Sequence, residues 1–335
     1  MIKVYATPKG TGGKAVNITP IVSRVSWSSN LDQIAKKVEL TVFDDRSDLF
    51  PQNPVERGSI IALVGETGEL FRGIVMDDSK AGREPAIYTA FDAGIYLANN
   101  KEIFQFNNIR VDSAIRQVLD FYSIPTAFVN SISIMVDRYY IDKSAIEIIK
   151  DLLDEARKFT GRRYMMRTAK GRFYIEVEGS TTIAAKFKLY AEDTEHDATV
   201  AIGNAQRTGS TEKMRNSIKV LFKEEKEGDT LIENVMTLKD STLIRDYGLL
   251  QEVIEIPAED KPKAKQIATN MLADLGKVEE SFSIRLFGDE RVEAGVNISD
   301  LSDDIVGIDG TFLVKGAVHL YEREEHTMDL DLVKI

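Results

Sequence analysis

Apolar and polar residues alternate along several short segments in the first hundred positions of the chain. The clearest of these segments are Val38–Phe43, Ile60–Val64, Phe71–Met76 and Ala86–Phe91. Alternation with a period of two places the apolar side chains on one face of an extended strand. Short strands at this spacing predict a sandwich or barrel over residues 1–98, with one helical piece at Leu31–Lys36.

Residues 99–180 show a different pattern, which is typical of a compact α+β unit. Apolar residues recur at helical spacing over 111–122. A second helix is predicted to begin after Asp142 as its N-cap and to end at Gly161, which suits a left-handed C-terminal position. The strands of a predicted hairpin follow this helix, and they are Tyr164–Thr168 and Arg172–Val177.

Residues 181–335 return to alternating segments. These are Ser217–Lys223, Glu233–Leu238, Ser281–Phe287 and a closing hairpin of Thr311–Leu320 with Thr327–Ile335. One helix over 261–275 interrupts them, with Pro262 in its first turn and Gly276 after its end. The pattern predicts a second barrel over 181–335, with the helix on its flank.

One series of short segments occurs twice, in the same order. The first series is Gln33-Ile-Ala35, Leu40-Thr-Val-Phe43, Val55-Glu-Arg-Gly58 and Arg72-Gly73. The second series is Gln266-Ile-Ala268, Ile284-Arg-Leu-Phe287, Val292-Glu-Ala-Gly295 and Lys315-Gly316. Each match is short, but the shared order favours an internal duplication as a hypothesis.

Composition narrows the classes of function that the chain can have. It has 335 residues, 43% of them hydrophobic, and a net charge of -11. This charge argues against duplex nucleic acid or an anionic membrane as the main partner. The absence of cysteine excludes disulfides, thiolate metal sites and cysteine nucleophiles. No segment is apolar and long enough to predict a membrane span or a signal peptide.

The chemistry-bearing residues support only weak alternatives. A carboxylate-based peptidoglycan hydrolase would need two facing acids, for example among Asp137, Asp142 and Glu176. A cell-wall-binding module would use exposed aromatic rings, and the candidates are Tyr139, Tyr140 and Tyr164. Both alternatives remain open from the sequence.

The sequence evidence for a metal site or a nucleic-acid-binding site is weaker still. The acidic segment Glu192–Asp197 lacks a calcium-loop pattern, and the glycine-rich Gly10–Gly13 is not a phosphate-binding loop. His319 and His326 flank a predicted turn and face each other across a hairpin, without a third ligand. The basic run Lys158–Arg167 follows a helix end, where cations are favourable. We therefore assign no catalytic, cofactor-binding or metal-binding residue and predict that the chain is not an enzyme.

The third part of the chain resembles the baseplate hub proteins of contractile phage tails. This group comprises the late-control protein D family and its shorter relatives in PBSX-type prophages and tail-like bacteriocins. The segments that carry the resemblance are Asn216–Val220, Asp240–Gly248, the helix Ala264–Leu275, Val292–Gly295, Gly310–His319 and Met328–Leu332. The Asp-Ser…Tyr-Gly segment and the Gly-x-Phe-x-Val-x-Gly…His ending are the most specific of these.

The resemblance implies an α+β, mainly β fold, with two tube-protein-like antiparallel β-barrels and an α/β domain between them. It implies a homotrimeric adaptor that binds the hexameric tail tube protein, a spike protein and baseplate wedge proteins, without a cofactor. Three chains with two similar barrels each would match a six-fold tube to a three-fold spike.

This chain departs from relatives that carry a fused spike, because Ile335 follows a strand directly. We therefore expect the spike to be a separate protein. The resemblance further implies a phage virion tail or a tail-like bacteriocin particle, assembled in the bacterial cytoplasm. DNA would pass through the lumen without specific binding, and an acidic lumen wall would repel it.

Overall fold

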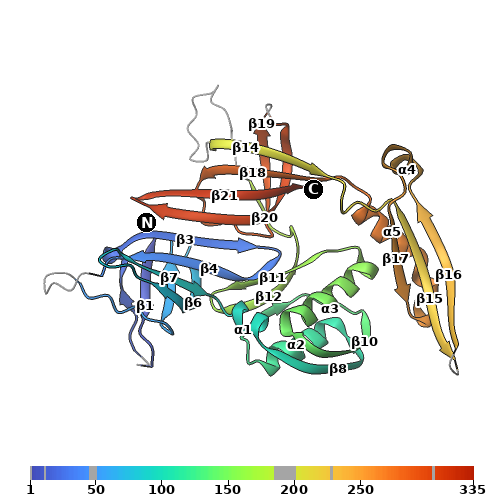
Figure 1. The fold of residues 1–335 in the computed structure, drawn as a ribbon, viewed down its shortest axis with the longest axis horizontal. Helices are drawn as coiled ribbons and strands as arrows, with labels where there is room; N and C mark the ends of the chain where they lie inside the picture. The colour runs from blue at the N-terminus through green and yellow to red at the C-terminus, as the bar shows by residue number, and fades with distance from the viewer. Residues whose placement is uncertain (1, 11–12, 45–50, 185–200, 227–228, 304–305) are drawn as a thin grey trace.

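The computed structural model describes residues 2–10, 13–44, 51–184, 201–226, 229–303 and 306–335. The molecule is elongated, with the second β-rich half above the first, a mixed domain below the second half and beside the first, and a separate small sheet at one end (Figure 1). The α+β, mainly β class predicted from the sequence is confirmed.

The first half is an antiparallel sheet in the order β3-β4-β7-β6-β5-β1-β2. Its elements are β1 (Lys3–Thr7), β2 (Val16–Asn17), a 3-10 turn (Thr19–Ile21), β3 (Val22–Asn30), β4 (Gln33–Val42), β5 (Ile60–Val64), β6 (Glu69–Ser79) and β7 (Ala86–Phe91). The alternating apolar residues Val38, Leu40 and Val42 are fully buried in its core, as their spacing predicts. Burial of these side chains against those of β1 and β5 holds the sheet in a curved shape around one core.

The second half has its own core and the strand order β14-β18-β21-β20, with β19 beside β20 and β13 beside β19. Its elements are β13 (Thr182–Ala184), β14 (Ala201–Ser210), β18 (Glu279–Phe287), β19 (Asn297–Asp303), β20 (Ile308–Glu322) and β21 (Glu325–Lys334). Phe282 and Phe312 meet edge to face at its centre. The closing hairpin predicted from the sequence is present as β20 and β21 and is longer than predicted.

The two halves share one strand order. The series β3-β4-β7-β6-β5-β1 in the first half corresponds to β14-β18-β21-β20-β19-β13 in the second, although β13 is parallel to β19 while β1 is antiparallel to β5. Leu40 pairs with Tyr88 as Ile284 pairs with Leu330. This correspondence supports the duplication hypothesis with topology as well as with sequence.

A turn and a bulge recur at equivalent positions in both halves. Gly58 and Gly295 adopt φ of +91° and +94°, and their amides donate to the carbonyls of Val75 and Val314 at 2.8 Å. After each of these valines the ladder to the next strand shifts by one residue. Val75 and Val314 are therefore equivalent, so the sequence match of Arg72-Gly73 to Lys315-Gly316 is out of register by four positions.

The halves do not stand as two separate barrels. In the described residues, β20 pairs with β3 and joins them into one sheet of thirteen strands. A helix was predicted at Leu31–Lys36, and this is wrong. Asn30 and Gln33 close a tight turn there, and β4 begins at once, because its residues pair with β3 on one side and β7 on the other. Cross-strand pairing outweighs the local helical propensity of six residues.

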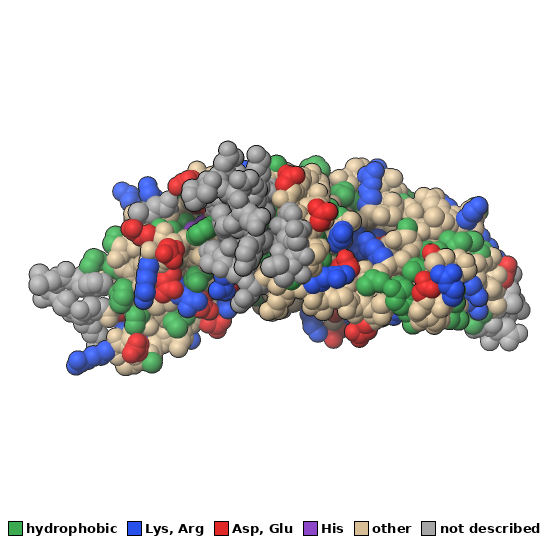
Figure 2. All heavy atoms as spheres, turned by 90° about the horizontal axis from the view of Figure 1, so that it is seen from above, with side chains coloured by type: hydrophobic (Ala, Val, Ile, Leu, Met, Phe, Trp, Pro, Cys, Tyr) green, Lys and Arg blue, Asp and Glu red, His purple; other side chains and the backbone are tan. Residues whose placement is uncertain are grey.

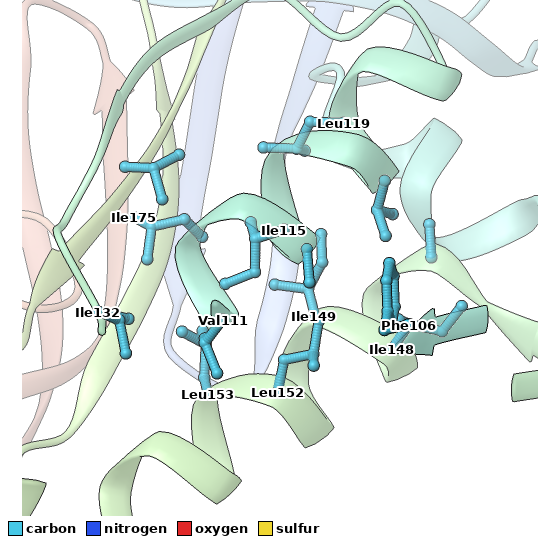
Figure 3. Close-up of a cluster of buried hydrophobic side chains, with 14 of the residues drawn as sticks. Phe106, Val111, Ile115, Leu119, Ile132, Ile148, Ile149, Leu152, Leu153 and Ile175 are labelled. Atoms are coloured by element: carbon cyan, nitrogen blue, oxygen red, sulfur yellow. The ribbon is translucent and has the colours of Figure 1, made fainter. Parts of the chain in front are cut away.

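The middle domain packs helices against two small sheets around the largest core cluster. Its elements are α1 (Gly94–Asn99), β8 (Lys101–Arg110), α2 (Val111–Phe121), β9 (Thr126–Val129), β10 (Met135–Ser144), α3 (Ala145–Thr160), β11 (Tyr164–Ala169) and β12 (Arg172–Val177). Figure 3 shows Ile115 of α2 and Ile149 of α3 pointing toward each other across this core. The predicted helix over 111–122 and the predicted hairpin are confirmed.

The start of α3 corrects one sequence prediction. Ser144, not Asp142, is the N-cap, because its hydroxyl accepts from the Glu147 amide while Glu147 accepts from the Ser144 amide at 2.8 Å. Asp142 lies in a bulge of β10 with a positive φ. The end at Gly161, with φ +67°, is as predicted.

We expect Ser144→Ala to lower the free energy of unfolding by about 1 kcal/mol, because it removes the reciprocal capping bonds of α3. Ser113→Ala, inside the first turn of α2, is the matched control and should change stability by less than ~0.5 kcal/mol. Urea titration of both variants measures the difference. Equal midpoints for the two variants would show that the capping box contributes nothing.

Residues 181–335 contain more than the second half-sheet. A separate three-stranded sheet is formed by β15 (Ser217–Lys226), β16 (Asp229–Lys239) and β17 (Gln251–Ile256), with α4 (Ser241–Tyr247), a 3-10 turn (Ala258–Lys263) and α5 (Ala264–Leu275). The helix predicted over 261–275 thus splits into a 3-10 turn and α5. It packs on this sheet and against α3, where Asn270 donates to the Phe159 carbonyl at 3.0 Å. The single barrel predicted over 181–335 is therefore interrupted by an inserted subdomain.

Candidate assembly interface

The acids considered for a hydrolase are held in separate local contacts. Asp137 accepts from the Asn108 amide at 2.7 Å, and Asp142 is exposed beside Lys101. Glu176, on another sheet, binds the guanidinium of Arg167 at 2.7 and 3.1 Å. Within the described residues, no group of three His, Cys, Asp or Glu side chains is placed to hold a metal ion. The arrangement offers no pair of facing acids among these three.

The three tyrosines considered for glycan binding do not form one platform. Tyr139 is 77% exposed on the outer face of β10, whereas Tyr140 is buried and donates to Asp151 at 2.6 Å. Burial and the Asp151 carboxylate raise the pKa of Tyr140. Tyr164 packs against the core of the middle domain. Two of the three rings therefore serve packing, as is usual for aromatic residues between helices and strands.

Three of the four basic residues in the run at 158–167 form ion pairs within the molecule, and Arg162 is exposed. Arg163 pairs with Asp274, Arg167 with Glu176 and Lys158 with Glu155. Figure 2 shows Lys and Arg side chains interspersed with Asp and Glu over the face that it displays. On this face the described residues form no continuous basic surface for a nucleic acid. The acidic segment 192–197 lies outside the described residues, as do residues 11 and 12 of the glycine-rich segment.

The strongest candidate for a functional contact in the molecule is the antiparallel pairing of β20 with β3, which we call the seam. Seven consecutive residues of β20, from Gly316 to Glu322, pair antiparallel with Asn30 to Arg24. His319 lies directly opposite Trp27, and the two rings stack at 4.6 Å with an interplanar angle of 2°. His319 Nδ1 is 3.0 Å from His326 Nε2, which confirms that these histidines face each other across a hairpin.

Polar contacts reinforce the seam on both sides. Lys36 of β4 forms an ion pair of 2.6 Å with Glu293, and their side chains are only 9% and 25% exposed. The Ala294 amide donates to Ser29 at 2.9 Å, and the Thr67 amide donates to Glu290 at 3.1 Å. The seam is therefore a specific contact between the halves, made by side chains as well as by the strand pairing. None of its partners except the two histidines was predicted from the sequence.

Equivalent strand edges elsewhere in the chain are free within the described residues. By the correspondence of the halves, the end of β6 is equivalent to the part of β20 that pairs with β3, and β14 is equivalent to β3. The exposed residues at these two edges are Asp77, Asp78, Ser79 and Lys80 on one, and Gln206, Arg207, Thr208 and Gly209 on the other. Unpaired strand edges are templates for pairing with another chain.

The face of the joined sheet that lies opposite the cores is mainly polar, although it also exposes the apolar side chains of Phe43, Ile87, Phe287 and Val318. Along β4 it presents Lys37 and Glu39, which pair at 3.4 Å. Across the second half it presents Arg285 and Asp329, which form two hydrogen bonds of 2.6 and 2.8 Å. Serine and threonine side chains lie between them, and these are Ser26, Ser28, Thr41, Thr89, Ser281 and Ser283. By strand pairing, Arg24, Lys37 and Arg285 share this face with Glu39, Asp77, Glu322, Asp329 and Asp331, so carboxylates outnumber basic residues.

Comparisons with known proteins agree with this architecture. The sequence model of the YQBQ-like family matches residues 25–333. The chain is 25% identical, over 94% of its length and 93% of the relative's, to the phage-like element PBSX protein XkdQ of Bacillus subtilis. These matches confirm the resemblance to the PBSX-type group.

Solved structures show the same fold. A 43 kDa tail protein of prophage MuSo2 from Shewanella oneidensis has a TM-score of 0.67 at 14% identity, covering 99% of this chain and 98% of that one. An Escherichia coli protein, c3393, described as a component of the type VI secretion system, has a TM-score of 0.54 at 9% identity, covering 94% and 74%. In the described residues, no helix is long and apolar enough to cross a membrane.

Proposed function

The chain belongs to the YQBQ-like family and contains two copies of one half-sheet, and we propose that it is a structural hub of a phage-tail baseplate. Three copies form a ring that joins a six-fold tail tube to a three-fold spike made by a separate protein, with wedge proteins outside. Relatives named as PBSX phage-like element and prophage tail proteins support a place in a tail or tail-like particle. The observation that carries the proposal is the β3–β20 seam.

The pairing of β3 with β20 within one chain indicates how neighbouring chains pair in the proposed ring. Inside one chain, the second half offers the edge of β20 and the first half accepts it with β3. The first half offers the equivalent edge at the end of β6, and the second half of a neighbouring chain accepts it with β14. Such a contact joins two different surfaces, so it closes into a ring when the rotation fits. Seams within and between chains then alternate around six similar half-sheets.

The two kinds of seam differ in the way that this assembly requires. The intrachain seam is aromatic and buried, with His319 stacked on Trp27. At the equivalent positions the free edges carry Lys80 and Arg207, which are exposed. Charged residues keep an open edge soluble and limit pairing to a matching partner. The free edges therefore suit surfaces that meet water before assembly.

The polar face of the joined sheet becomes the wall of the channel in such a ring. The cores occupy the opposite face, so only the hydroxyl-rich face with its paired charges is free to line a lumen. Ion pairs such as Arg285–Asp329 offset part of the charge, and the remaining carboxylates leave the wall acidic. We expect such a wall to hold a passing polymer only weakly.

Native mass spectrometry of the chain with the tube and spike proteins of the same particle tests this function. We expect a complex with three copies of this chain, six of the tube protein and three of the spike protein. Two half-sheets per chain are the reason for the doubled tube count. A complex with one tube subunit per chain, or no association with either protein, contradicts the proposal.

A further inference from the structure

The hydrogen bonds of His319 and His326 determine which of their ring nitrogens carry a hydrogen. His319 Nε2 lies 2.8 Å from the carbonyl oxygen of Val292, which can only accept, so this nitrogen carries a hydrogen. His319 Nδ1 is then the acceptor for the Nε2–H of His326 at 3.0 Å. Both rings are neutral in this arrangement: His319 donates one hydrogen bond and accepts one, and His326 donates one.

The surroundings favour the neutral rings. His319 is 1% exposed beneath Trp27, and its burial, with His326 beside it, lowers its pKa to about 3. Burial also lowers the pKa of His326, whose ring lies near that of Tyr321. With His326 in this tautomer, an added proton on His319 would point two N–H groups at each other across 3.0 Å.

The nearby charged groups are already engaged. Asp289 and Glu290 face the pair from the loop after β18, and they bind Arg291 and the Thr67 amide, respectively. Lys36 faces it from β4 and is paired with Glu293. Within the part of the chain that the structure describes, neither histidine has an ion-pair partner. A proton on the pair therefore has no carboxylate in direct contact.

We propose that the seam between β3 and β20 is an acid-sensitive joint, opened by protonation of the His319–His326 pair. The closed seam holds both rings neutral, whereas an open seam exposes them to water, where they bind protons below about pH 6.5. Acid therefore favours the open form. The free edges at β6 and β14 have Lys80 and Arg207 at the positions of His319 and Trp27, so they lack this switch. The inference concerns a single chain and does not depend on the ring.

The size of the pH effect follows from the difference between the pKa of His319 in the closed seam and in the open seam. Between pH 6.5 and the folded pKa of about 3, each unit of pH changes the ratio of open to closed seam about tenfold for His319 alone. From pH 7 to pH 5 the ratio should rise about 25-fold, and more if His326 takes up a proton as well.

Hydrogen exchange of the full chain at pH 7 and pH 5, corrected for intrinsic rates, tests the joint. We expect protection factors of β3 and β20 amides to fall about 25-fold, while those of α2 and α3 stay unchanged. Emission of Trp27, the single tryptophan, should change over the same range. In His319→Gln, whose amide can still donate to Val292, the fall should be much smaller than 25-fold, because only His326 remains to take up a proton.

Three results would contradict the proposal that the seam opens in acid. One is protection of β3 and β20 that does not change between pH 7 and pH 5. Another is an equal loss of protection in α2 and α3, which shows global unfolding. The third is the same fall in a folded variant that lacks His319, and His319→Phe, which keeps a ring on Trp27, serves if His319→Gln does not fold.

Discussion

Glu293→Leu should lower the free energy of unfolding by about 3 kcal/mol. It leaves the ammonium of Lys36 buried at the junction of the halves without its ion-pair partner. The loss exceeds the value of the pair itself, because an unpaired buried charge keeps its full desolvation cost. Guanidinium titration, monitored by circular dichroism, measures the change.

An exposed ion pair provides the matched control. Arg285 and Asp329 lie on the open face, with side chains 56% and 47% exposed. Asp329→Ala should therefore cost less than ~1 kcal/mol. The double variant Lys36→Met with Glu293→Leu should regain much of the loss, because it removes both charges. A similar cost for Glu293→Leu and Asp329→Ala would mean that burial does not govern the pair at the seam.

Local signals in the sequence predicted the elements whose stabilising contacts are close in sequence. Helix α2 follows from its apolar spacing, and the end of α3 follows from Gly161, because both depend on neighbouring residues. The N-cap of α3 was placed two residues early, since Asp142 and Ser144 are both good caps. Only the reciprocal contact with Glu147 distinguishes Ser144, and the Ser-x-x-Glu spacing was the signal available for it.

Contacts distant in sequence were predicted only where a repeated pattern existed. The two series of short segments indicated equivalent halves, and the turns at Gly58 and Gly295 bear out their third member. Their first member is wrong, because Gln33–Ala35 lies in β4 and Gln266–Ala268 lies in α5. The seam itself was not predicted, because the residues that pair across it, such as Trp27 and His319, are almost 300 positions apart. The inserted sheet of β15 to β17 was read as part of the second barrel, since alternation does not reveal which strands pair.

The residues of the candidate interface between chains were not predicted from the sequence for the same reason. Exposed edges carry no apolar pattern, so Ser79 and Thr208 attract no notice in the sequence. They become candidates only when the ladders of the two halves are aligned through Val75 and Val314. The residue-level prediction of the ring contact thus needs the structure, whereas the family resemblance needed only the sequence.

Disulfide trapping in the assembled particle tests the ring contact most directly. The chain has no cysteine, so an introduced pair reports one contact. Ser79→Cys with Thr208→Cys places thiols where β6 of one chain should meet β14 of the next. The equivalent pair within one chain is Val318→Cys with Ser28→Cys, whose positions are opposite each other in the seam.

On oxidation, the control pair should close inside one chain and migrate as a monomer on a non-reducing denaturing gel. The pair at Ser79 and Thr208 should give covalent dimers and trimers and nothing larger, because three chains complete the ring. A control that closes while the test pair stays monomeric, or a ladder that continues beyond the trimer, would contradict the proposed hub.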